Sequence, residues 1–212
     1  MDRHLHGKTL APLLLASALL AGISFWPISH ILPQGPGFIA WKTLGVALLA
    51  LWALLVARDG AGRLLAVALA FSALGDALLE LSRSLGGAAF LASHIVAFTL
   101  YRGRRRADGQ ALGLGIAVII PLAAWLLTHD IGVLVYACGL GAMTGSAWAS
   151  RLPRHLVALG ASMFAASDLL IFAHFDVLRD SALPPLLIWP LYFGGQALIA
   201  WGAGRALARE AR

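Results

Sequence analysis

The sequence predicts an all-α membrane protein, a single transmembrane domain over residues 1–212 with eight helices that each cross the bilayer. Of the 212 residues, 60% are hydrophobic and 12% are charged, whereas about 25% of the residues in a soluble domain are charged. Nearly every apolar run is 17 or more residues long. Runs of that length suit helices that cross about 30 Å of hydrocarbon, and not the ten-residue strands of a transmembrane barrel.

Charged and Pro/Gly-rich segments separate the apolar runs and set the ends of the expected helices. The first run follows Arg3 and Lys8, as the core of a signal peptide would. Trp26-Pro27 and a Pro/Gly-rich turn then follow it instead of a small-residue cleavage site, so we expect a retained helix. Arg58-Asp59-Gly60 ends the second helix, and a short turn at Gly86-Gly87 is expected to join the third to the fourth.

Basic and proline residues delimit the second half of the chain in the same way. A cluster of four arginines between Arg102 and Arg106 closes the fourth helix, and Pro121 is expected to kink the fifth. Arg151-Leu152-Pro153-Arg154 precedes the seventh helix. The eight helices are expected at residues 10–28, 38–56, 64–81, 87–100, 111–127, 131–149, 155–175 and 186–207.

Positive residues cluster in every second loop, on one side of this arrangement, which provides a test of the number of spans. With the N-terminus inside, 13 Lys and Arg residues fall inside and 3 fall outside. Those outside are Lys42, Arg83 and Arg179, and those inside are Arg3, Lys8, Arg58, Arg63, Arg102, Arg104, Arg105, Arg106, Arg151, Arg154, Arg205, Arg209 and Arg212. We therefore expect both termini in the cytoplasm, in a multi-pass protein of a bacterial inner membrane.

The placement of charge and the cysteine count exclude several classes of protein. A net charge of +6 would suit nucleic-acid binding, but the arginines mark helix ends and form no stripe with aromatic residues, so no nucleic-acid partner is expected. Cys138 is the only cysteine, and without a Cys/His cluster no metal site is expected. The motifs of serine hydrolases, zinc proteases and nucleotide-binding proteins are absent. The oligomeric state stays open.

A weak internal repeat relates the two halves of the chain. Residues 75–79 of the third helix resemble residues 167–171 of the seventh, which gives Asp76 and Asp168 equivalent positions. Asp76 lies 13 residues beyond Arg63 and Asp168 lies 14 beyond Arg154, so both are expected about 20 Å above the cytoplasmic helix ends. A parallel repeat of two four-helix halves would bring the two carboxylates together at that depth.

Polar side chains inside apolar helices are the candidate functional residues. A carboxylate at mid-bilayer costs about 2.5–3.5 kcal/mol on insertion scales, so it normally faces a cavity or a partner. Ser72, Asp76 and Glu80 stand four residues apart and share one helix face. A pair of buried carboxylates can divide into a proton donor and an anion, as in glycosidases. Other polar residues expected at a similar level, in the outer half of the bilayer, are Lys42, His94, Tyr136, Tyr192 and Gln196.

Each candidate also has a structural explanation. The two aspartates could form structural hydrogen bonds or an ion pair with Lys42, and His94 could be a packed core histidine. Glu80 could pair with Arg83 three residues later. Lys42 could extend to the membrane surface, and Tyr192 could belong to an interfacial aromatic belt.

Four motifs in a fixed order resemble the YhhN-like lysoplasmalogenase family, over about residues 42–201. They are Phe71-Ser72-Ala73-Leu74-Gly75-Asp76, Ala89-Phe90-Leu91-Ala92-Ser93-His94, Phe164-Ala165-Ala166-Ser167-Asp168, and Tyr192 followed by Gln196. Two positions depart from the family pattern. Lys42-Thr43 replaces the Lys-Pro of the second helix, and Ala97-Phe98 replaces the tyrosine that often follows the histidine.

The resemblance implies a membrane enzyme, without a cofactor, that hydrolyses the vinyl ether bond of lysoplasmalogens. The products would be a fatty aldehyde and glycerophosphocholine or glycerophosphoethanolamine. Because vinyl ethers are protonated at carbon before water captures the cation, we expect Asp168, among apolar neighbours, as the acid, Asp76 as the ionised partner, and His94 as a third catalytic residue. The residues expected to bind this lysophospholipid of the membrane are Lys42, at its phosphate, with Ser72, Glu80, Tyr136, Tyr192 and Gln196.

Two other functional classes remain open from the sequence. A transporter for small solutes or lipids would also carry parallel repeats and polar groups within the membrane, although the chain lacks the paired Gly/Pro-broken helices typical of transporter sites. A sensor or scaffold without catalysis would use the same polar residues structurally. Release of aldehyde by the purified protein separates the enzyme from both.

Overall fold

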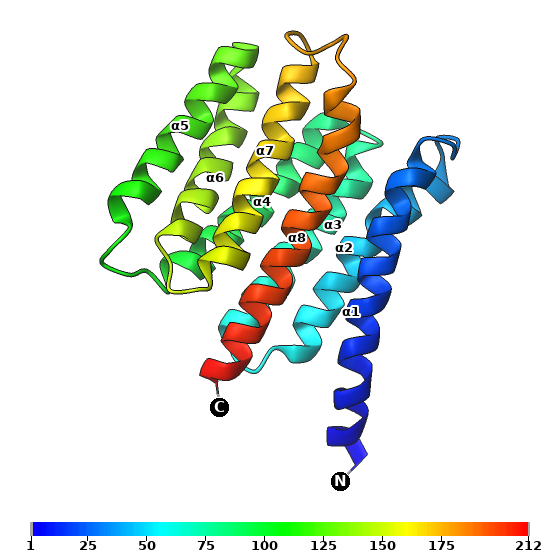
Figure 1. Cartoon of the computed structure of the whole chain (residues 1–212), viewed down its shortest axis with the longest axis vertical. Helices are drawn as coiled ribbons and strands as arrows, with labels where there is room; N and C mark the ends of the chain where they lie inside the picture. Colours follow the sequence, from blue (N-terminus) through cyan, green and yellow to red (C-terminus); the bar gives the residue numbers. More distant parts are fainter. Residues whose placement is uncertain (1, 212) are drawn as a thin grey trace. The chain divides into compact units, whose positions relative to one another are not determined.

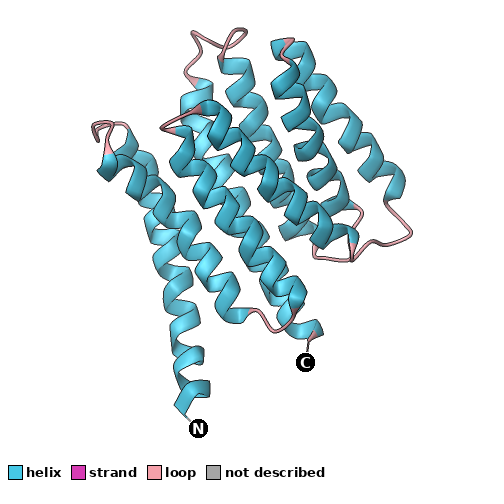
Figure 2. Cartoon of the chain, turned by 180° about the vertical axis from the view of Figure 1, so that it is seen from behind, coloured by secondary structure: helices cyan, strands magenta, loops and turns pink. Residues whose placement is uncertain are grey.

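The computed structural model describes residues 2–211, with side chains described from residue 10 onward, so the predicted basic side chains of Arg3 and Lys8 lie outside the described part. Within residues 2–211 the chain is helical and has no β-strand, which confirms the all-α fold class (Figure 2). Eight of the described helices are long and apolar enough to cross a membrane. The helices are α1 Asp2–Ser29, α2 Pro36–Val56, α3 Gly60–Leu79, α4 Arg83–Arg102, α5 Gln110–Thr128, α6 Ile131–Trp148, α7 Leu159–His174 and α8 Leu183–Glu210, with a π-helical turn, η1 Arg154–Ala158, leading into α7.

The helices divide into two compact units, and the boundary between the units crosses α4 and α8. Unit 1 contains residues 1–93 and 203–212, and unit 2 contains residues 94–202. Unit 1 therefore holds α1, α2, α3 and the first half of α4, while unit 2 holds α5, α6, α7 and most of α8.

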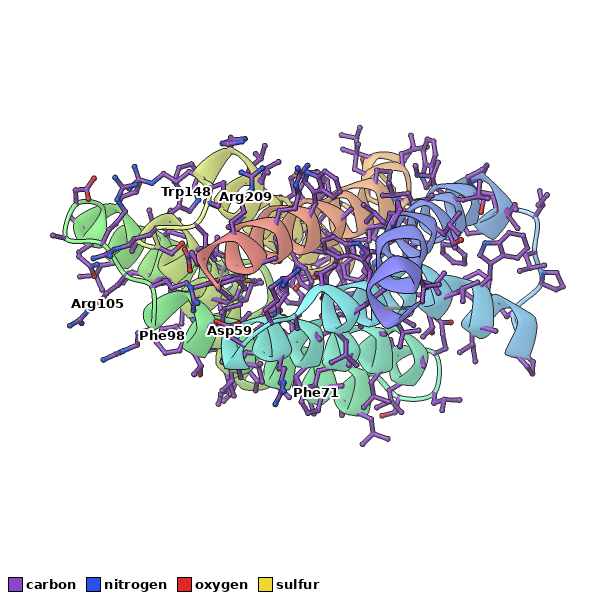
Figure 3. All side chains as sticks on the ribbon, turned by 90° about the horizontal axis from the view of Figure 1, so that it is seen from below. Asp59, Phe71, Phe98, Arg105, Trp148 and Arg209 are labelled. Atoms are coloured by element: carbon purple, nitrogen blue, oxygen red, sulfur yellow. The ribbon has the colours of Figure 1, made fainter. Side chains whose placement is uncertain are left out.

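Unit 1 is built around α2, which packs against both α1 and α3. Phe25 of α1 meets Phe38 of α2 edge to face, with ring centroids 5.1 Å apart. Asp59, labelled in Figure 3, caps α3 by accepting a 2.8 Å hydrogen bond from the backbone N–H of Gly62. In Figure 1 the N-terminal end of α1 and the C-terminal end of α8 lie at the same end of unit 1 as the α2–α3 loop.

The turn between α3 and α4 differs from the prediction. We expected it at Gly86-Gly87, but α3 ends at Leu79 and α4 begins at Arg83, so both glycines lie inside α4. A Cβ atom at Gly86 would lie 2.7 Å from the backbone nitrogen of Leu79. Gly86 is therefore needed for the close approach of the two helices, and not for a turn conformation.

In unit 2, α5, α6 and α7 pack against one another (Figure 1). The α5–α6 contact uses backbone atoms, because a Cβ atom at Gly113 would lie 2.5 Å from the carbonyl oxygen of Gly145. Asp130 caps α6 through a 2.9 Å hydrogen bond from the N–H of Val133.

The two arginine-rich loops of unit 2 are joined to each other. The N–H of Arg106 donates to the carbonyl of Ala149 at 2.9 Å, and the N–H of Arg151 donates to the carbonyl of Arg104 at 2.8 Å. Arg105 is exposed, and its side chain points away from the ribbon in Figure 3. Within unit 2 the basic clusters that follow α4 and α6 thus lie together, as the alternation of charge predicts.

Candidate active site

A chain of hydrogen bonds in unit 2 joins three of the predicted site residues. Tyr136 of α6 donates its hydroxyl to Oδ2 of Asp168 on α7, with an O–O distance of 2.6 Å. The same hydroxyl lies 3.0 Å from Nε2 of His94 on α4. His94 is 1% exposed and Asp168 is 7% exposed, so both ionisable groups are removed from solvent. Tyr136 links the carboxyl group of Asp168 to the imidazole of His94, a position that the sequence did not reveal.

The hydrogen-bond chain can carry a proton in either direction. A phenol has one hydrogen to donate, so while Tyr136 donates to Asp168 it accepts from an Nε2–H of His94. When Asp168 is protonated, the direction of both hydrogen bonds can reverse. The carboxyl group then donates to Tyr136, and Tyr136 donates to an unprotonated Nε2 of His94. The two arrangements differ by the transfer of two hydrogens along existing contacts, and the imidazole stays neutral only if its Nδ1 gains a proton as Nε2 gives one up. These hydrogen bonds can therefore carry a proton between the imidazole of His94 and the carboxyl group of Asp168.

Aromatic rings surround the hydrogen-bond chain. The ring of His94 meets those of Tyr136 and Phe164 edge to face, at centroid distances of 5.2 and 5.1 Å. The ring of Phe172 also meets the ring of Tyr136 edge to face, with ring centroids 6.0 Å apart. These contacts hold the imidazole and the phenol in fixed orientations and confirm that the helix carrying Asp168 presents apolar neighbours.

The two predicted residues of α8 face the interior of unit 2. Tyr192 is 5% exposed and packs against Phe164 at 5.2 Å and Trp189 at 5.5 Å. It extends the aromatic cluster and is not an exposed residue of an interfacial belt. Gln196, one turn later, is 3% exposed. The hydroxyl of Ser167, next to Asp168, donates to the carbonyl of Ile188 at 2.9 Å and fixes α7 to α8.

Unit 1 contains a second cluster of polar side chains, around the face of α3 that carries Ser72 and Asp76. Ser72 is 1% exposed and Asp76 is 2% exposed, as predicted, whereas Glu80, the third residue of the predicted helix face, is the C-cap of α3 and its side chain is 20% exposed. The hydroxyl of Ser93 donates to the carbonyl of Ala68 at 2.8 Å, and therefore accepts the hydrogen of Ser72, whose Oγ lies 2.8 Å away. Sequence reasoning missed Ser93, although it stands in one of the four family-like motifs, immediately before His94.

Lys42 and Glu80 form an ion pair in unit 1. The Nζ atom of Lys42 donates to Oε1 of Glu80 at 2.5 Å. The side chains are 17% and 20% exposed, respectively, so the pair is neither sealed in the core nor fully solvated. The sequence alone allowed other partners for these residues, namely Arg83 for Glu80 and an aspartate for Lys42.

The structure thus groups the predicted residues in two sets. His94, Tyr136 and Asp168 are joined by hydrogen bonds in unit 2, and Tyr192 and Gln196 are buried in the same unit. Lys42 and Glu80 are joined in unit 1, where Ser72 and Asp76 are buried. The meeting of Asp76 with Asp168 and the parallel repeat stay predictions.

An open pocket of about 450 Å³ lies at the arginine-rich loops of unit 2. It is lined by Arg106, Ala107, Asp108 and Arg151. The guanidinium of Arg106 donates to both carboxylate oxygens of Asp108, at 2.8 and 2.7 Å, and these hydrogen bonds hold the pKa of Asp108 below its usual value. The pocket contains none of the predicted site residues.

Comparison with known proteins identifies related sequences. The sequence model of the YhhN family matches residues 37–203. Proteins named lysoplasmalogenase, one from Mycobacterium bovis and one from Mycobacterium tuberculosis, are each 30% identical to the chain over 210 residues, with 88% of this chain and 80% of the relative covered. No solved structure matches at a significant level.

Proposed function

This chain belongs to the YhhN family, and from that premise we propose that it hydrolyses the vinyl ether bond of lysoplasmalogens. The products are a fatty aldehyde and glycerophosphocholine or glycerophosphoethanolamine. The substrate is a lysophospholipid of the membrane in which the protein resides, in our proposal a bacterial inner membrane.

The observation that best supports this chemistry is the buried chain formed by Asp168, Tyr136 and His94. Vinyl ether cleavage requires a Brønsted acid strong enough to protonate carbon and held where water does not compete for its proton. Asp168 is a carboxyl group in such a place, and Tyr136 engages only its Oδ2 atom. We propose that the other carboxyl oxygen of Asp168, Oδ1, carries the proton that is donated to the substrate.

The proposed reaction consumes one water molecule. Asp168 transfers its proton to the alkenyl carbon farther from the ether oxygen, which forms a C–H bond and leaves an oxocarbenium ion. Water adds to the cationic carbon and loses a proton, which restores a protonated acid and forms a hemiacetal. Protonation of the glycerol oxygen and loss of the hemiacetal hydroxyl proton then break the C–O bond, giving the aldehyde and the alcohol.

The other predicted residues have supporting roles in this scheme. Tyr136 and His94 return to Asp168 the proton that the adding water loses, along the hydrogen bonds already present. Asp76 is proposed as the ionised carboxylate that stabilises the oxocarbenium ion and orients water. The aromatic side chains of Phe164, Phe172 and Tyr192 are buried and keep the surroundings of Asp168 apolar.

Aldehyde release by the purified protein tests the function. Detergent-solubilised protein is incubated with an alkenyl lysophosphocholine, and the fatty aldehyde is trapped and quantified. The matched control is the saturated 1-alkyl analogue, in which the C=C bond to be protonated is missing. We expect aldehyde from the alkenyl lipid alone, in stoichiometric amount with glycerophosphocholine. Transport of the lipid into liposomes with no aldehyde would contradict the proposal and favour a transporter.

A further inference from the structure

The ion pair of unit 1 has the charge pattern of a zwitterionic lipid headgroup. Lys42 supplies a cation and Glu80 an anion, in direct contact and partly exposed. Phosphocholine and phosphoethanolamine carry the complementary arrangement, a phosphate anion followed by an ammonium cation. A headgroup that enters between the two side chains would replace one ion pair with two.

We propose that Lys42 and Glu80 together recognise the headgroup, with Lys42 binding the phosphate and Glu80 binding the ammonium group. This assignment rests on the proposed function, because it takes the substrate to be a lysoplasmalogen. It adds a role for Glu80 and a reason for the pairing of the two residues. The pair is then the determinant of headgroup specificity.

The position of the pair along the helices fits the size of the substrate. Glu80 follows Asp76 by four residues and retains helical backbone angles as the C-cap of α3, so the two residues are separated by about 6 Å along the axis. In the substrate, five bonds separate phosphorus from the vinyl ether oxygen, about 6 Å at the extended-chain spacing of about 1.2 Å per bond. A phosphate bound by Lys42, which contacts Glu80, thus places the vinyl ether bond near the level of Asp76.

The pair also lies near the ends of its helices, where lipid headgroups are found. Lys42 is six residues from Pro36 at the start of α2, and Glu80 directly follows the last residue of α3. Both side chains keep a fraction of their surface exposed. A headgroup can reach them from the interface while the alkenyl chain extends along the apolar helices.

The pairing creates selection against anionic headgroups. A phosphate monoester without an ammonium group would pair with Lys42 but leave Glu80 facing a second anion, which is unfavourable at a partly buried site. A zwitterion leaves neither side chain unpaired. The site therefore favours phosphocholine and phosphoethanolamine lipids over alkenyl-glycerophosphate.

Binding and turnover are measured separately to test this proposal. The substrates are alkenyl lysophosphocholine and alkenyl-glycerophosphate, and the binding probes are their uncleavable 1-alkyl analogues. We expect Glu80→Gln to lower the preference for phosphocholine over phosphate at least about tenfold, in both KM and Kd. Lys42→Gln is expected to weaken binding of both headgroups. Thr43→Val is the matched control on the neighbouring residue, because within the described residues the hydroxyl of Thr43 has no hydrogen-bond partner.

The double variant Lys42→Gln/Glu80→Gln keeps the test valid where a single change leaves an unpaired charge and impairs folding. It is expected to bind the two headgroups with nearly equal affinity. An unchanged headgroup ratio in Glu80→Gln and in the double variant would overturn the proposal. A third outcome separates the two proposals. If binding of the 1-alkyl lipids shows a headgroup preference that depends on Glu80, but no alkenyl lipid releases aldehyde, the binding site is retained and the proposed hydrolysis is refuted.

Discussion

Tyr136 donates a 2.6 Å hydrogen bond to Oδ2 of Asp168, so the proposed acid is held in place by a phenol on a neighbouring helix. The bond joins α6 to α7, and the contact of the same hydroxyl with His94 adds α4. The proton-bearing group is thus held by three helices of unit 2. Its orientation depends on their packing.

The carboxyl of Asp168 is expected to be essential for turnover. Asp168→Asn keeps the shape of the side chain but removes the proton that is transferred to carbon, so turnover should fall at least about 10²-fold, the lower end for a general acid. Asp76→Asn should have an effect of the same order through loss of the stabilising anion. The measurement is initial aldehyde release by folded, detergent-extracted protein. Asp108→Asn is the control, since Asp108 is exposed in a loop. More than about a tenth of wild-type turnover in either variant would remove that aspartate from the mechanism.

Removal of the Tyr136 hydroxyl is expected to impair proton resupply. Tyr136→Phe leaves Asp168 and His94 without their shared partner, so we expect a fall in kcat of about 10-fold or more and a loss of stability of about 1–3 kcal/mol. The solvent isotope effect on kcat should change with it, which a purely structural role would not produce. Tyr101→Phe is a matched control.

The control is well suited because the hydroxyl of Tyr101 is buried and has no hydrogen-bond partner among the described residues. Its removal costs no hydrogen bond, so we expect normal turnover and unchanged or slightly higher stability. Equal losses in the Tyr136 and Tyr101 variants would indicate that the phenyl–phenol exchange itself, and not the hydrogen-bond chain, is responsible.

Gly86 and Gly87 are expected to respond differently to alanine. A Cβ atom at Gly86 would overlap the backbone of Leu79, whereas a Cβ atom at Gly87 would meet nothing within 4 Å. Gly86→Ala should therefore destabilise the protein by about 1–3 kcal/mol, and Gly87→Ala should be neutral or stabilising by up to about 1 kcal/mol. Thermal unfolding in one detergent measures both. Equal midpoints for the two variants would contradict the close contact between α3 and α4.

Reporter fusions test the topology predicted from the alternation of charge. Fusions after residue 58 and at both termini should show cytoplasmic activity, and a fusion in the turn between α3 and α4 should show external activity. The internal positions control for the terminal ones, because neighbouring loops must give opposite signals. An external C-terminus would reject the eight-span arrangement.

The periodic spacing of apolar runs made the helices predictable. Most expected ends lie within a few residues of the observed ends, since Arg58, Asp59 and the arginine-rich loops interrupt hydrophobic runs at the places where helices stop. Burial of Ser72, Asp76 and Asp168 followed from the same argument, because polar side chains in apolar helices avoid lipid.

The unpredicted features depend on contacts between residues far apart in the chain. Glycine is common in turns, so the sequence favours a turn at Gly86. Only its close approach to Leu79 explains why it lies within a helix. From the sequence, both Arg83 and Lys42 could pair with Glu80. The observed partner is Lys42, 38 positions earlier, which the packing of α2 on α3 brings to Glu80. The role of Tyr136 as a link required knowledge of which faces of α4, α6 and α7 meet.

The glycine contact between α5 and α6 bears on how the protein enters the membrane during synthesis. Gly113 and Gly145 let the two backbones touch, and attraction between such closely packed helices requires no side chain from a later part of the chain. The connecting segment holds only His129 and Asp130. The two helices can therefore leave the translocon as a preassembled hairpin, which would present Tyr136 to the incoming helix of Asp168 as soon as that helix emerges.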